Sequence, residues 1–212
     1  MALSIEDFRK YLNPNLDTKR KSRLEVAFRS LGYQDMYCRY HYAEFHKQHQ
    51  LFLDAMGGEL GNEEIINPQY FRLAFEANCF AFFRSFHALV ESIPYLLNLL
   101  IEVESDSELR TINWSFIVKA SLSSAVYSDG INKIKALRAS SSYKELEHIS
   151  NVSKHRRIVR IDGGVFSIGE KTSFCADDFD MQFKSYEINE LMETMYDEMY
   201  PQIIDIIKSF LR

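Results

Sequence analysis

The residues best suited to chemistry gather in one polar, basic segment of the C-terminal half. His148, Asn151 and His155 are spaced i, i+3 and i+7, so a helix through this segment would carry them in one narrow stripe. Three basic residues accompany them: Lys154, Arg156 and Arg157. An imidazole changes charge near neutral pH, and neighbouring cations stabilise a phosphate. The stripe therefore has the residue types to bind a phosphate and to move a proton.

The same segment has a second interpretation, as a solvent-exposed helix face whose basic residues compensate the negative end of the helix macrodipole. The wider charge pattern fits both interpretations. Residues 130–160 hold eight Lys and Arg against two Glu, a balance of +6. Residues 161–212 hold eleven Asp and Glu against four Lys and Arg, a balance of −7. Such a pattern marks an anionic partner or two faces that attract each other within the fold.

A second polar stripe lies on the most apolar predicted helix. Arg84, His87 and Glu91 share one face of that helix by the same i, i+3 and i+7 spacing. We expect them either to complete a ligand-binding site across a groove from His155 or to form a satisfied polar stripe between packed helices.

Metal and cofactor chemistry has little support in the sequence. Of His41, His46 and His49, only the last two have the i, i+3 spacing that helical metal ligands need. The sequence has no glycine-rich phosphate loop and no Gly-x-Ser-x-Gly motif. We therefore predict no metal site and no cofactor, and we exclude the common nucleotide-dependent enzymes and serine hydrolases.

Helices must position these residues, because 8 Gly and 4 Pro in 212 residues are too few for the turns of an all-β fold. Apolar residues at helical spacing predict a mostly α fold, a bundle of about six helices. The most apolar segment, 68–103, predicts a central, buried helix. We expect one domain over residues 1–212, with helices over residues 4–56 and 186–211 packing on a core of residues 68–157.

Local signals divide these elements further. Interruptions of the helices are expected at three positions: Gly32, Pro94 and Pro201. The segment from Ser142 to Glu145 has the pattern of a capping box and predicts the start of the helix that carries His155. Residues 158–168, with glycines at 163 and 164, predict a small β-hairpin.

The cysteines and the N-terminal residues indicate a soluble protein of the cytoplasm. Cys38, Cys79 and Cys175 are odd in number and far apart, which fits reduced thiols. The N-terminal residues lack the basic segment and apolar run of a signal peptide. The most apolar window, 93–103, is too short to span a bilayer, so we expect no membrane contact.

A Phe-rich run from Phe80 to Pro94 precedes a helix that ends in Asn-x-x-Lys-His-Arg at residues 151–156. This combination resembles the HEPN superfamily of helical-bundle proteins, over roughly residues 68–157. Many HEPN domains are RNases, whereas others bind nucleotides or partners. Active members carry an Arg-x(4–6)-His motif, and dimerisation brings two such motifs into one site.

The resemblance implies a role for each polar residue. His155 matches the motif histidine and Asn151 is a nearby polar substitute, so these two are the candidate catalytic residues. His148, Ile149 and Ser150 occupy the positions of the motif arginine, which is therefore missing. The candidate ligand-binding residues are His148, Lys154, Arg156, Arg157, Arg84, His87 and Glu91.

The function that follows is binding of RNA, a nucleotide or another anionic partner by a HEPN-like homodimer. If the protein is an enzyme, the resemblance implies a metal-independent RNase. The alternative is a non-catalytic protein-interaction or structural module.

Overall fold

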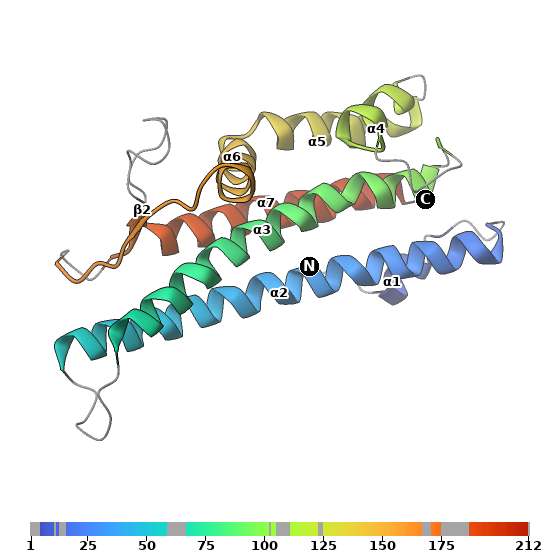
Figure 1. The fold of residues 1–212 in the computed structure, drawn as a ribbon. Helices are drawn as coiled ribbons and strands as arrows, with labels where there is room; N and C mark the ends of the chain where they lie inside the picture. Colours follow the sequence, from blue (N-terminus) through green and yellow to red (C-terminus); the bar gives the residue numbers. More distant parts are fainter. Residues whose placement is uncertain are drawn as a thin grey trace. The chain divides into compact units, whose positions relative to one another are not determined.

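The computed structural model describes residues 5–10, 12, 16–58, 67–101, 103–104, 111–122, 125–166, 171–174 and 187–211. Of these described residues, 83% lie in helices, which confirms the mostly α class with a small two-stranded sheet. The elements follow one another in this order (Figure 1): α1 (Ile5–Lys10), α2 (Thr18–Gly57), α3 (Pro68–Ile101), α4 (Trp114–Ser121), the 3-10 helix η1 (Ala125–Tyr127), α5 (Ser128–Ala139), α6 (Ser141–His155), β1 (Ile161–Asp162), β2 (Ser173–Phe174) and α7 (Ile188–Phe210).

The chain forms two compact units, each built from segments that are distant in sequence. Unit 1 consists of Met1–Asp35, His87–Lys144 and Asp197–Arg212, and unit 2 consists of Met36–Phe86 and Glu145–Tyr196. Helices α2, α3, α6 and α7 each contribute one part to either unit. The single-domain organisation expected from the sequence stays a prediction.

Phenylalanine rings from α2, α3 and β2 form the core of unit 2. Phe45 and Phe52 of α2 both contact Phe75 of α3, with ring centroids 6.1 and 5.4 Å apart. Phe174 of β2 lies 6.0 Å from Phe83 of α3, again between ring centroids. All five rings are buried. Edge-on and tilted ring pairs of this kind stabilise a core beyond the burial of their apolar area, so they fix how α2 and α3 lie side by side in this unit.

Unit 1 combines aliphatic packing with polar groups that close helix ends. Ile117 of α4 and Ile134 of α5 are fully buried. The buried Arg20 side chain donates from Nε to the carbonyl oxygen of Leu99, at 2.7 Å. That carbonyl belongs to the last turn of α3, where the helix offers it no partner of its own. Burial lowers the pKa of Arg20, and the carboxylate of Asp17 opposes this shift.

The long helices continue through all three positions where interruptions were expected. Gly32 lies inside α2, Pro94 inside α3 and Pro201 inside α7. An internal glycine costs a helix about 1 kcal/mol and an internal proline about 3 kcal/mol. Most helical stability in a folded protein comes from packing of the apolar face, which offsets such a local cost. The first turns of α3 are less buried than predicted, because Tyr70 and Leu73 are exposed.

The predicted β-hairpin is present, but its second strand lies further along the chain. β1 pairs antiparallel with β2, in the register Ile161 with Phe174 and Asp162 with Ser173. Residues 165 and 166, expected in the second strand, form a turn, and residues 167–168 lie outside the described residues. Burial explains the choice, since the Phe174 side chain is 4% exposed whereas Phe166 is 99% exposed.

Gly130 of α5 gives a test of packing in unit 1. A Cβ atom at Gly130 would lie 2.3 Å from Cε2 of Phe210, far inside van der Waals contact. We predict that Gly130→Ala lowers the free energy of unfolding by about 1–3 kcal/mol, the usual cost of overpacking a core. Urea denaturation followed by circular dichroism measures this change.

Gly32 of α2 supplies the matched control, because nothing lies within 4 Å of a Cβ atom built there. Gly32→Ala should raise the free energy of unfolding by about 0.5–1 kcal/mol, since alanine loses less backbone entropy on folding. Shifts of the same sign and size in the two variants would contradict the close approach of Phe210 to α5.

Candidate functional site

The helix that carries the candidate residues begins with a cap from Ser140. The backbone N–H of Tyr143 donates to Oγ of Ser140 at 3.2 Å. The hydroxyl of Ser142, the residue predicted to start a capping box, donates instead to a carboxylate oxygen of Glu198 on α7. The predicted capping box is therefore wrong, because a tertiary hydrogen bond uses the Ser142 hydroxyl. The observed cap, Ser140, lies two residues before the predicted one, and α6 begins at Ser141.

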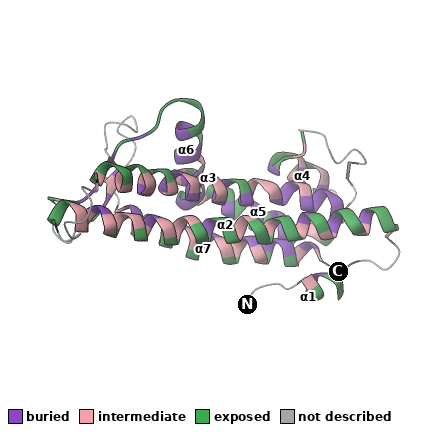
Figure 2. Ribbon diagram, turned by 60° about the horizontal axis from the view of Figure 1, so that its bottom comes forward, coloured by how far each residue is buried: buried purple, intermediate pink, exposed green. Residues whose placement is uncertain are grey.

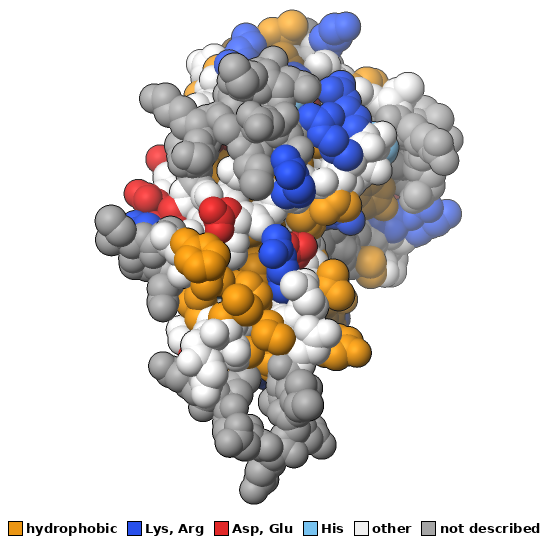
Figure 3. Space-filling model, turned by 60° about the vertical axis from the view of Figure 1, so that its left-hand side comes forward, with side chains coloured by type: hydrophobic (Ala, Val, Ile, Leu, Met, Phe, Trp, Pro, Cys, Tyr) orange, Lys and Arg blue, Asp and Glu red, His pale blue; other side chains and the backbone are white. Residues whose placement is uncertain are grey.

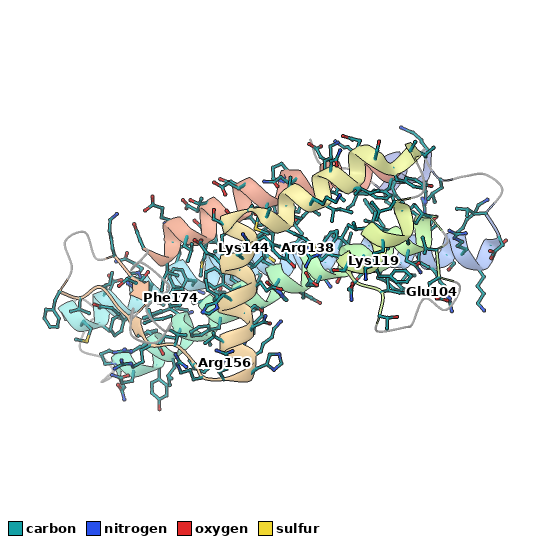
Figure 4. All side chains as sticks on the ribbon, turned by 90° about the horizontal axis from the view of Figure 1, so that it is seen from above. Glu104, Lys119, Arg138, Lys144, Arg156 and Phe174 are labelled. Carbon is teal, nitrogen blue, oxygen red and sulfur yellow. The ribbon has the colours of Figure 1, made fainter. Side chains whose placement is uncertain are left out.

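The C-terminal end of α6 presents the basic segment on the surface of unit 2. The exposed residues at this end are Asn151, Lys154, His155, Arg156 and Arg157. The amides of Arg156 and Arg157 donate to the carbonyl oxygen of Val152, at 3.0 and 3.1 Å, which ends the helix. Arg156 is labelled at this end of α6 in Figure 4. We call Lys154, His155, Arg156 and Arg157 the basic helix end.

The stripe predicted from helical spacing is accessible along only part of its length. Asn151 and His155 are exposed, whereas His148 is half-buried and its Nε2 atom is buried. A ligand at the surface can therefore reach the exposed amide of Asn151 and the imidazole of His155 more readily than the imidazole of His148.

Burial also separates the three positions that a motif arginine would occupy. Ile149 and Ser150 are fully buried on the core side of α6. His148 is the one of the three that shares a helix face with His155, by the i, i+7 spacing. An arginine at 149 or 150 would point away from His155, so only position 148 has the geometry for the motif.

Arg84 of α3 closes the carbonyl end of α6. Its guanidinium donates from Nη2 to the carbonyl oxygen of Ser153 and from Nε to Oγ of the same residue, at 3.2 Å. The carbonyls of the last helical turn lack helical partners and carry the negative end of the macrodipole. A charged donor there neutralises this end, and hydrogen bonds to charged groups are stronger than neutral ones.

His87 and Glu91, the other two members of the predicted second stripe, lie in unit 1, whereas Arg84 lies in unit 2. Oε1 of Glu91 accepts hydrogen bonds from Nε1 of Trp114 and from the hydroxyl of Tyr143, both at 2.9 Å. These three residues belong to unit 1, as does the buried His87. Glu91 therefore forms a polar contact of α3 with α4 and α6, as one of the two sequence-based interpretations expected.

The partner of Arg84 and one further exposed cation were not predicted from the sequence. Ser153 was not singled out, although a serine on the apolar side of α6, seven residues after the buried Leu146, signals a polar contact inside the core. Arg160, counted only in the charge balance, is exposed four residues after Arg156. Figure 3 shows Lys and Arg side chains spread over one face, with some Asp and Glu side chains among them.

The histidines of α2 have separate partners in unit 2. A ring nitrogen of His41 lies 2.9 Å from Oδ1 of Asn78, and Nε2 of His49 lies 2.9 Å from the carbonyl oxygen of Gly163. His46 packs edge-on against Tyr42. Within the described ranges, no group of three or more His, Cys, Asp or Glu side chains is placed to hold a metal ion.

Two of the three cysteines lie in the part of the chain that the structure describes. Cys38 and Cys79 are free thiols and both are buried. Burial, and secondarily the charge of Glu76, raises the pKa of Cys79 well above its usual value. This thiol therefore stays protonated and is a poor nucleophile. Cys175 lies outside the described residues.

Comparisons with known proteins place the chain in no established family. No protein-family model matches the chain, and neither a curated protein nor a solved structure gives a significant match. Among the described residues, no helix is long and apolar enough to cross a membrane.

The contact between Arg84 and Ser153 can be tested by removing the guanidinium alone. Arg84→Met keeps most of the aliphatic side chain but leaves the Ser153 carbonyl without its charged donor. We predict a loss of about 1.5–3 kcal/mol in the free energy of unfolding. Arg39→Met is the control, because Arg39 is exposed where it donates a hydrogen bond to Tyr196 and lies over its ring, and the loss of these contacts should cost less than about 1 kcal/mol. Equal stabilities of the two variants would argue against the cap.

Proposed function

We propose that the protein binds RNA or a nucleotide through the basic helix end of α6, without cleaving it. The observation that carries the proposal is the exposure of four consecutive residues with three fixed cations, Lys154 to Arg157, around an exposed imidazole. Phosphate groups dominate the affinity of proteins for nucleic acids, and they are bound chiefly by Lys and Arg side chains.

The electrostatics of the helix end support an anionic ligand. A helix C-terminus by itself repels anions, since it carries roughly half a negative charge. Here the guanidinium of Arg84 is hydrogen-bonded to the Ser153 carbonyl and offsets that charge. The three cations of the basic helix end and Arg160 are exposed, so their side chains are within reach of an anionic ligand.

The resemblance to HEPN domains adds RNA or a nucleotide as the ligand and a homodimer as the assembly. The three widely spaced cysteines favour the cytoplasm as the location. Binding without cleavage is favoured because two of the three positions for the motif arginine are buried, at Ile149 and Ser150, and the third holds His148. The exposed candidate residues are His155, which matches the motif histidine, and Asn151, a nearby polar substitute. Their side-chain N–H groups are hydrogen-bond donors for a phosphate or a base, with no chemical step required.

A non-catalytic protein-interaction module is the second candidate. A separate observation favours it, namely exposed aromatic and apolar side chains on α2, which include Tyr37 and Tyr40. The two candidates differ in what the basic helix end does, because only the first requires it for nucleic-acid binding.

Affinity for RNA tests the proposal directly. Arg156→Ala with Arg157→Ala should weaken binding of a fluorescein-labelled single-stranded RNA about tenfold or more. The slope of log affinity against log salt should also become shallower by about 1.4, because each of the two lost phosphate contacts removes roughly 0.7 from it. Fluorescence anisotropy at several salt concentrations measures both quantities.

The control removes the same charge elsewhere. Lys19 and Arg23 are exposed near the start of α2, so Lys19→Ala with Arg23→Ala changes the net charge equally. If this control weakens binding as much as the pair in α6, attraction is non-specific and the basic helix end is not the site.

Cleavage is tested at position 148, which among the three positions for the motif arginine is the one that shares a helix face with His155. We expect the wild-type protein to leave RNA intact in the presence of EDTA, because the motif arginine is missing. His148→Arg recreates the Arg-x(6)-His spacing, and we predict cleavage that a further His155→Ala abolishes. Cleavage by the wild type that depends on His155 would overturn binding without cleavage. Inactivity of His148→Arg would remove the catalytic part of the HEPN comparison.

A further inference from the structure

The chain that leaves the basic helix end alternates between buried and exposed residues. Val159 and Ile161 are buried, whereas Ile158, Arg160 and Asp162 are exposed. A period of two is that of an extended chain with one side against the core and the other toward the solvent. The side chains of Ile158 and Arg160 therefore lie on the outer side of this segment, and Figure 2 shows exposed residues there in green.

Contacts from α2 and α3 hold this segment within unit 2. Nη2 of Arg72 donates to the carbonyl oxygen of Ile161 at 3.1 Å, and Nε2 of His49 lies 2.9 Å from the carbonyl oxygen of Gly163. Gly163 also lies against Phe52, since a Cβ atom there would be 2.7 Å from Cε1 of that ring. The inner side of the segment is thus attached to two helices, so its exposed side chains project from a held backbone.

The segment ends in a turn that presents one aromatic ring to the solvent. The backbone N–H of Gly164 donates to Oδ1 of Asp162 at 3.0 Å, and Gly164 has a φ of 80°, a conformation that favours glycine. Two residues later, the side chain of Phe166 is 99% exposed. Single exposed apolar residues are common on proteins. Here, however, Ile158 and Phe166 share one short segment with the exposed cation Arg160, and these are residue types of a nucleic-acid surface.

We infer that Phe166 stacks on an unpaired base of a single-stranded RNA whose phosphates lie along Arg160 and the basic helix end. This inference rests on the proposed function and adds the class of nucleic acid and a subsite for its bases. Proteins that bind single strands combine cations that follow the backbone with aromatic rings on which bases stack. A duplex keeps its bases paired and stacked within the helix, so an exposed ring favours unpaired RNA.

The order of charged and apolar residues favours RNA over a protein partner. Arg157 precedes Ile158, and Arg160 lies between Ile158 and Phe166. The core of a protein interface is depleted of charged residues, so this alternation does not suit it. Each nucleotide brings one phosphate and one base, which matches cations interleaved with apolar side chains. The carboxylate of Asp162, the one acidic residue of residues 157–166, is hydrogen-bonded within the turn.

The length of the segment fits a short strand of RNA. An extended chain advances about 3.3 Å per residue, so the nine steps from Arg157 to Phe166 span at most about 30 Å. Stacked nucleotides repeat about every 3.4 Å, so about nine of them cover that length. A strand of about twelve nucleotides can therefore contact the basic helix end and Phe166 together.

Fluorescence anisotropy with a fluorescein-labelled RNA of about twelve nucleotides tests the stacking. Phe166→Ala should weaken binding about 5- to 100-fold, the range for removal of a stacking side chain. The salt dependence should not change, because no charge is removed. Phe166→Trp should keep the wild-type affinity. Tyr40→Ala is the control, because Tyr40 is exposed in the same unit but lies half a turn around α2 from His49, which contacts the segment.

Two further measurements report the stacking itself. RNA should quench the fluorescence of the Phe166→Trp variant, whereas the wild type should change little, because its one tryptophan, Trp114, is buried. The wild type should also bind the single strand more tightly than a duplex of equal length, and Phe166→Ala should remove most of that preference. Circular dichroism confirms that the variants are folded.

The outcomes distinguish the stacking from the proposed function. If the wild type binds RNA through Arg156 and Arg157, but Phe166→Ala weakens binding no more than Tyr40→Ala does, stacking is overturned and the proposed function stands. If the wild type binds no RNA, both are overturned. If Phe166→Ala leaves the affinity for RNA unchanged but abolishes binding to vesicles of anionic phospholipid, the ring contacts a membrane surface and the stacking is again overturned.

Discussion

The guanidinium of Arg84 joins α3 to the carbonyl end of α6, and the candidate site depends on this contact. Its Nε and Nη2 atoms donate to Oγ and the carbonyl oxygen of Ser153, the residue that precedes the basic helix end. Without Arg84, the last turn of α6 would add its negative dipole to the surface that we propose as the phosphate-binding site. The same contact links the C-terminal end of α6 to α3. The backbone that carries the cations is therefore held in place.

The aromatic core of unit 2 holds α3, the helix that carries Arg84, in place. Phe75 lies between Phe45 and Phe52, and Phe83 lies against Phe174 of the small sheet. Packing of rings from three elements leaves α3 little freedom to shift in unit 2. Figure 2 shows exposed residues along α2 in green, and Tyr37 and Tyr40 are among the exposed side chains of this helix. Helix α6 supplies the surface that we propose for binding an anion.

Periodicity in the sequence was enough to predict the mostly α class and the burial of the Phe-rich helix from Phe75 onward, because both follow from apolar spacing. It failed where long-range contacts decide. Ser142 has the pattern of a cap but binds Glu198, and β1 pairs with Ser173 and Phe174 rather than with the nearest apolar residues. At the candidate site, spacing predicted the exposed stripe from Asn151 to His155. It could not show that Arg84 would meet Ser153, since 69 residues separate them.

Two-dimensional NMR of the isotope-labelled protein, titrated with a short single-stranded RNA, tests the central claim most directly. The account predicts that the largest shifts of backbone amides fall on residues 153–157, with smaller changes at the Arg84 side chain that supports them. Shifts confined to other surfaces, with these amides unchanged at saturating RNA, would contradict the assignment of the basic helix end as the binding site.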